Sequence, residues 1–99
     1  MRTKTLDELR TKNKDAILAL ASRYGVRNVR VFGSVARGED RQDSDIDFLI
    51  SLEQGRDLMD WSGFWIDLKD MLQRDIAVVE ESSLHWFLRE PILSEAVQL

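Results

Sequence analysis

The chain has 99 residues, of which 43% are hydrophobic and 32% are charged, with a formal net charge of −4 and no cysteine. This composition is that of an ordinary globular protein, and the missing cysteines exclude disulfides and thiolate metal sites. No apolar run approaches the ~18 residues of a membrane-spanning helix, and the N-terminus does not resemble a signal peptide. We therefore expect one domain over residues 1–99, no membrane contact and a cytoplasmic location.

The charge is unevenly distributed along the chain. Residues 1–30 carry eight Lys and Arg against three Asp and Glu, whereas residues 31–99 carry six against fifteen. The basic segment is typical of a solvated helix face; alternatively, it forms a surface for polyanions or for an acidic partner. An acidic chain in which basic and aromatic residues do not alternate gives little support to direct nucleic-acid binding.

The first half of the chain predicts a helix, a strand, a short helix and a second strand. A capping-box pattern at 5–8, apolar residues at helical spacing and a helix-ending Gly25 define the first helix, which we expect to break near residues 12–13. In chain order, the expected elements are a helix at 5–24, a strand at 29–32, a brief helix at 34–37, a polar loop at 38–44 and a strand at 45–51.

The second half predicts a long helix, a third strand and C-terminal helices. One face of the long helix is expected to carry Leu58, Trp61, Trp65, Leu68 and Leu72, with both tryptophans in the core or in an interface. A strand at 75–79 and helical segments at 83–88 and 91–97 follow, with Trp86 and Phe87 packed between helices and His85 in a structural role. The 20-odd residues between the second and third strands suit a right-handed crossover to a parallel neighbour. We therefore predict an α/β or α+β fold with a small mixed β-sheet flanked by helices.

Two carboxylates interrupt the second predicted strand. Asp45 and Asp47 are two residues apart, so both point to one face, whereas the apolar residues between and after them point to the other. Two such carboxylates repel each other and do not both stay ionised without a cation. Hard oxygen ligands with positions left for water and phosphate suit Mg²⁺. The alternative is a strand edge that carries charge for solubility.

The turn after the first strand has the composition of a phosphate cradle. Gly33 allows the backbone to approach a ligand closely, and the following helical turn presents N–H groups to an anion. The hydroxyls of Ser34 and Ser44 add polar groups. Arg37 either stabilises phosphate charge or ties the loop to an acidic neighbour. A triphosphate held here would reach a metal on Asp45 and Asp47.

The arrangement Phe32-Gly33-Ser34, ten residues, then Asp45-Ile46-Asp47-Phe48 resembles the signature of the DNA polymerase β-like nucleotidyltransferase superfamily. The stretch "GSVARGEDRQDSDIDFLI" is similar to the minimal nucleotidyltransferase (MNT) family in particular, and the ending "REPILSEAVQL" extends the resemblance over nearly the whole chain. The resemblance implies an ATP- and Mg²⁺-dependent transferase that acts on the α-phosphate. Many members are antitoxins that add AMP to a tyrosine of a partner HEPN-domain RNase toxin.

By the same resemblance, Gly33 and Ser34 grip the triphosphate, and Asp45 and Asp47 hold the metals and are catalytic. The family typically supplies a third carboxylate from the third strand, where this chain has Ala77. Asp75 lies two residues earlier, about 7 Å along the strand, and is expected to be a surface residue at the strand end. The alanine at position 77 is either an engineered replacement of an aspartate or the result of natural decay into a non-catalytic partner protein. An active adenylyltransferase antitoxin, a non-catalytic nucleotide-binding or toxin-masking partner, and an acidic structural domain therefore remain open.

Overall fold

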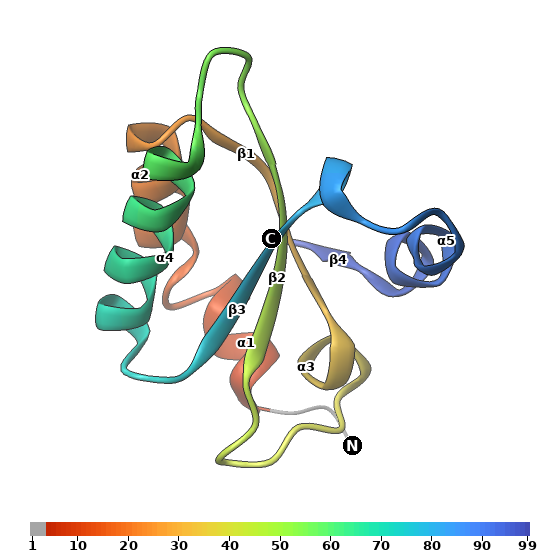
Figure 1. The fold of residues 1–99 in the computed structure, drawn as a ribbon. Coiled ribbons are helices and arrows are strands. Elements are labelled where there is room, and N and C mark those ends of the chain that lie inside the picture. The colour runs from red at the N-terminus through yellow and green to blue at the C-terminus, as the bar shows by residue number, and fades with distance from the viewer. Residues whose placement is uncertain (1–3) are drawn as a thin grey trace.

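Helices and strands alternate along the chain in a computed structural model that describes residues 4–99 (Figure 1). In chain order, the elements are α1 (Lys4–Arg10), α2 (Lys14–Arg23), β1 (Val26–Phe32), α3 (Gly33–Arg37), β2 (Ile46–Leu52), α4 (Leu58–Leu72), β3 (Ile76–Glu80), the 3₁₀ turn η1 (Glu81–Ser83), α5 (Trp86–Glu95) and β4 (Val97–Gln98). The predicted α/β or α+β class is confirmed, because helices flank a mixed sheet. No helix within residues 4–99 is long and apolar enough to cross a membrane.

The four strands form one sheet in the order β3-β2-β1-β4. β1 pairs antiparallel with β2, and β4 pairs antiparallel with the other side of β1. β3 runs parallel to β2, with α4 as the connection between them. The expected parallel neighbour across a helical crossover is therefore confirmed, whereas β4 was not predicted, because two residues are too short to show an alternating pattern.

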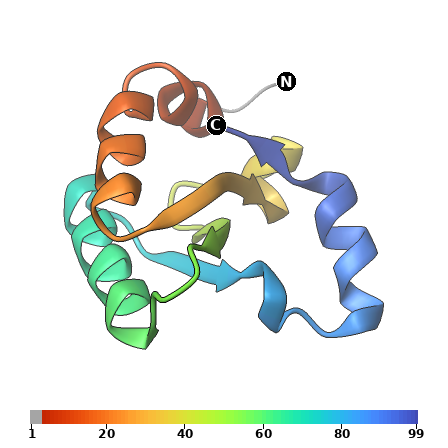
Figure 2. The same cartoon turned by 90° about the horizontal axis from the view of Figure 1, so that it is seen from above.

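The helices lie on both sides of the sheet. α2 and α4 cover one face, whereas α5 lies on the other side, as both views show (Figures 1 and 2). The core lies between the sheet and the helices on the face that α2 and α4 cover, and side chains from both fill it. The fully buried members of this core include Ile17, Val31, Phe48, Ile50, Phe64 and Leu68.

The N-terminal helical region differs in one detail from the prediction. It is broken at residues 11–13, as expected, and Gly25 follows α2 with a φ of +69°. The predicted capping box at residues 5–8 is wrong, because Thr5 lies inside α1. Its hydroxyl instead accepts a hydrogen bond from Arg74 Nη1 at 2.9 Å.

The long helix α4 starts at a capping box that sequence inspection missed. The Asp57 side chain accepts hydrogen bonds from the backbone N–H groups of residues 59 and 60, and the Asp60 carboxylate accepts one from the Asp57 backbone N–H. This cap places Leu58 in the first turn, where it is 73% exposed, so the prediction that it belongs to the apolar face is wrong. Phe64 and Leu68 are the buried residues of the helix.

Trp61 and Trp65 fasten α4 to β3. Both pack against the core, which confirms the predicted contact. The indole N–H of Trp61 donates to the Val78 carbonyl at 3.0 Å, and that of Trp65 donates to the Ile76 carbonyl at 3.2 Å. The paired bonds orient the helix along the strand that follows it.

The C-terminal segment forms one helix rather than two. α5 runs through Pro91, so the expected helix start at this proline is wrong. Trp86 and Phe87 are 79% and 57% exposed, and the prediction that they pack between helices is wrong. His85 precedes α5 and accepts from the Phe87 N–H, which agrees with a structural role.

Candidate functional site

The two predicted carboxylates lie at the start of β2, where Asp47 faces away from the helices α2 and α4. Asp47 is half-buried, and its neighbours along the strand, Ile46 and Phe48, point into the core. Alternation along the strand therefore directs Asp47 to the opposite face of the sheet. Asp45 is exposed and comes one residue before β2 begins.

Burial and charge both act on Asp47. Burial raises the pKa of its carboxyl above the usual range, the negative charge of Asp45 raises it further, and Arg37 partly offsets the increase. A bound cation would remove this penalty, because it favours the ionised form of both carboxylates. Hard carboxylate oxygens of this kind fit Mg²⁺. Residues 4–99 contain no group of three or more His, Cys, Asp or Glu placed to hold a metal, so phosphate and water would have to supply the other ligands.

Gly33 brings the turn after β1 against Asp47. Phe32, the last residue of β1, is the partner of Asp47 across the antiparallel pair. Gly33 has a φ of +74°, and a Cβ atom added there would overlap the Asp47 Oδ2. Glycine is therefore required for two reasons: the left-handed backbone and the close approach to the carboxylate. The structure thus brings the predicted cradle and the predicted metal ligands together.

The Gly33 backbone N–H, expected to be free, already has a partner. It donates to Glu95 Oε2 at 2.7 Å, and Arg37 Nη1 donates to Glu95 Oε1 at 2.8 Å. Arg37 also donates through Nε to Glu39 at 2.8 Å. Both carboxylates raise the pKa of Arg37 above its usual value, and the hydrogen bond to Glu39 is the largest single cause. Of the two roles expected for Arg37, the tie to an acidic neighbour is present in this conformation.

Glu95 is the site residue that sequence reasoning missed. It ends α5 and lies 62 residues after Gly33, so no local spacing connects the two. Its negative charge also contributes to the raised pKa of Asp47. Only the packing of α5 beside α3 brings it to the turn (Figure 1).

Arg74 holds the loop that leads to Asp45. Its guanidinium donates to the carbonyls of Ser44, at 2.9 Å, and Arg41, at 3.0 Å. The Ser44 hydroxyl accepts from the Arg41 N–H at 2.8 Å, so this side chain closes a turn within the loop. Ser34, the other predicted hydroxyl, is half-buried in the first turn of α3.

The third strand places Ala77 directly beside Asp47, because the two are partners in the parallel β2–β3 pair. Paired residues on adjacent strands point to the same face. Asp75 instead lies before β3; its side chain is 76% exposed and forms an ion pair with Lys69 Nζ at 3.5 Å. The expectation that Asp75 is a surface residue at the strand end is confirmed.

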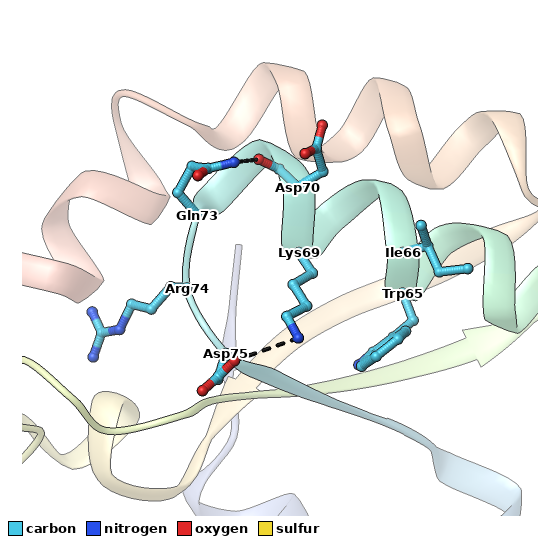
Figure 3. A pocket seen from close by; sticks show the side chains of 7 residues that line it. All are labelled: Trp65, Ile66, Lys69, Asp70, Gln73, Arg74 and Asp75. Atoms are coloured by element: carbon cyan, nitrogen blue, oxygen red, sulfur yellow. Dashed lines mark hydrogen bonds and ion pairs between the residues drawn. The ribbon is translucent and has the colours of Figure 1, made fainter.

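Asp75 also lines an open cavity of about 570 Å³ at the end of α4 (Figure 3). The other residues around it are Trp65, Ile66, Lys69, Asp70, Gln73 and Arg74. Arg74 points away from the Lys69–Asp75 pair, toward the loop that it holds. None of the six predicted site residues lines this cavity, so we place the candidate site at Asp47 and Gly33 instead.

Comparisons with known proteins agree on one family. The model of the nucleotidyltransferase domain family matches residues 5–99. The chain is 33% identical over 93 residues to the protein adenylyltransferase MntA of Thermococcus cleftensis, with 94% of each chain covered. A solved structure named "putative minimal nucleotidyltransferase" is 42% identical, with a TM-score of 0.84 and coverage of 100% of this chain and 97% of that one. A toxin–antitoxin complex with AMP-PNP has the same fold, with a TM-score of 0.73 at 22% identity over 87% of this chain and 71% of that one.

The chain therefore belongs to the nucleotidyltransferase domain family. The resemblance to minimal nucleotidyltransferases that the sequence predicted is confirmed. The predicted enzyme class, a nucleotidyltransferase, follows from the same match, and with it a nucleotide substrate.

Proposed function

We propose that residues 1–99 form one protein adenylyltransferase domain, which transfers AMP from ATP to a tyrosine of a HEPN-domain RNase toxin and thereby neutralises it. The observation that carries this proposal is the contact between Gly33 and Asp47, which unites a backbone turn with a carboxylate pair. The relatives support the same activity, since one is a protein adenylyltransferase and a protein of the same fold forms a toxin–antitoxin complex with AMP-PNP.

In this proposal the turn binds the triphosphate. The Gly33 N–H, the Ser34 hydroxyl and the Arg37 guanidinium are donors for phosphate oxygens. Ser44 acts through the loop, because its hydroxyl and carbonyl fix the chain just before Asp45. The binding groups thus come from two segments joined by a loop that Arg74 holds in place.

Asp45 and Asp47 would hold Mg²⁺. When bound, the ion neutralises charge on the carboxylates and the phosphates and helps to align the attacking and leaving oxygens. In the transfer, the tyrosine oxygen forms a bond to the α-phosphorus. The bond between the α-phosphorus and the oxygen that bridges it to the β-phosphate breaks, and pyrophosphate leaves with that electron pair. The tyrosine loses its proton, which a nearby carboxylate or water must accept.

A second candidate function is a non-catalytic partner that binds nucleotide or masks the toxin. Ala77 favours it, because the residue paired with Asp47 on the neighbouring strand can bind no metal and accept no proton. Asp75 does not compensate in this conformation, since its carboxylate is directed to Lys69.

Co-expression with the cognate toxin and measurement of its intact mass distinguish the two functions. Added AMP units on the toxin support the adenylyltransferase. An unmodified toxin that still co-purifies with this chain and is inhibited by it supports the masking function. The matched control is the Asp45→Asn/Asp47→Asn double variant, in which any AMP added by this chain should disappear.

A further inference from the structure

The last residue of α5 occupies the donors that the proposed function assigns to phosphate. One oxygen of the Glu95 carboxylate accepts the Gly33 N–H at 2.7 Å and the other accepts from Arg37 at 2.8 Å. An anionic group with two oxygens, held by a backbone amide and a guanidinium, satisfies the same donors as a phosphate does. We propose that Glu95 is an internal substitute for the nucleotide phosphate and must leave Gly33 and Arg37 before a triphosphate can bind there. This inference rests on the proposed function.

The charges around the site favour exchange of the Glu95 carboxylate for phosphate over simultaneous binding of both. The Asp47 carboxylate interacts electrostatically with Asp45, Arg37 and Glu95, and Arg37 is also shared with Glu39. A triphosphate that arrived while Glu95 stayed in place would lack two donors and would also face an additional negative charge. Competition, rather than joint binding, therefore follows from this arrangement.

The contact can open at low cost. The Glu95 side chain is 28% exposed, so its carboxylate can turn into water without burial of an unpaired charge. No residue of α5 is buried. The helix is fixed at both ends by other contacts: Arg89 pairs with Glu81 at 2.8 Å near its start, and β4 pairs with β1 after its end. A rotation of the Glu95 side chain is thus sufficient, and the sheet need not change.

Glu39 provides a matched control. It forms an ion pair with the same arginine at the same 2.8 Å distance, but it makes no contact with the Gly33 N–H, and its side chain is 65% exposed. Replacement of Glu39 therefore removes a charge of the same sign next to Arg37 and leaves the Gly33 donor occupied.

The test is a calorimetric titration of Mg-ATP, Mg-pyrophosphate and adenosine into the wild type, Glu95→Gln, Glu95→Ala and Glu39→Gln, each confirmed as folded by thermal unfolding. We expect both Glu95 variants to bind Mg-ATP and Mg-pyrophosphate roughly three- to tenfold more tightly than the wild type, as loss of a partly exposed ion pair predicts. We expect no gain for adenosine and a smaller gain for Glu39→Gln.

The outcomes separate this inference from the proposed function. If the wild type binds Mg-ATP and both Glu95 variants bind it equally or more weakly, Glu95 positions the donors instead, and only this inference is overturned. A gain for adenosine equal to that for pyrophosphate also overturns it. If neither the wild type nor the Glu95 variants bind any Mg-nucleotide, the proposed function fails and this inference fails with it.

Discussion

Ala77→Asp tests whether the third strand lacks a catalytic carboxylate. Ala77 is the partner of Asp47 across the parallel β2–β3 pair, and neighbouring strands lie about 4.8 Å apart. A carboxylate at position 77 would therefore point to the same face as Asp47 and lie about 5 Å from it. That position suits an additional metal ligand or a proton acceptor for the attacking hydroxyl.

The expected gain appears in the rate of transfer rather than in binding. A group that acts mainly in the transition state commonly contributes about 3–4 kcal/mol, which corresponds to a rate increase on the order of 10²–10³. Nucleotide affinity should stay within a few-fold, because Asp45 and Asp47 are unchanged. Without a cation, repulsion between carboxylates about 5 Å apart costs about 1–3 kcal/mol at an effective dielectric constant between that of water and ~20. The variant should thus unfold more readily than the wild type, and Mg²⁺ should reduce the difference.

Single-turnover labelling of the toxin by ATP measures the rate, with Ala77→Asn as the control of similar size without charge. We expect Ala77→Asp to label faster than both the wild type and Ala77→Asn. Equal rates in all three proteins would show that position 77 is not the site of a missing carboxylate. A destabilisation that Mg²⁺ does not reduce would show that the new carboxylate lies away from the metal-binding pair.

Three further substitutions test residues that shape the candidate site or stabilise the fold. Gly33→Val should abolish Mg-ATP binding in calorimetry, because its Cβ would displace the Asp47 carboxylate and the backbone φ is positive; full affinity in a folded variant would contradict this role. Trp61→Phe should lower the free energy of unfolding in urea by about 1 kcal/mol, since it removes the N–H donor to Val78 and keeps most of the ring area; no change would mean that water replaces the bond. Arg74→Lys should cost about 1.5–3 kcal/mol of stability and weaken Mg-ATP binding, because a single ammonium cannot replace the spread of guanidinium nitrogens that reach Thr5, Arg41 and Ser44; an unchanged affinity would show that the loop does not control nucleotide binding.

The central part of the fold could be predicted because its pattern is local. Ile46, Phe48 and Ile50 recur at every second residue and point into the core, although Leu49 between them is buried as well. This period of two predicts the strand and places Asp47 on its opposite face. The crossover through α4 follows from the number of residues between two strands. The resemblance to the family singled out Ala77 as the position of the third carboxylate, and the parallel register of β2 and β3 pairs this residue with Asp47.

The parts that could not be predicted depend on contacts between distant segments. Glu95 reaches Gly33 across 62 residues, and β4 consists of two residues that pair with β1 only after α5 has returned to the sheet. Leu58 has the right spacing for an apolar face, but the capping box makes it the first residue of α4, where it is exposed, whereas Trp61, Trp65, Leu68 and Leu72 further along the same face pack on the core. Trp86 and Phe87 remain exposed because no described element covers the start of α5.

The bonds from Trp61 and Trp65 to β3 also limit how the sheet can meet other chains. β3 is an outermost strand, and such strands can recruit a strand from another molecule through their free carbonyl and amide groups. Within residues 4–99, the carbonyls of Ile76 and Val78 are already occupied by the indoles, and the opposite outermost strand, β4, is only two residues long. Addition of a strand from another copy of the protein to either outermost strand is therefore hindered.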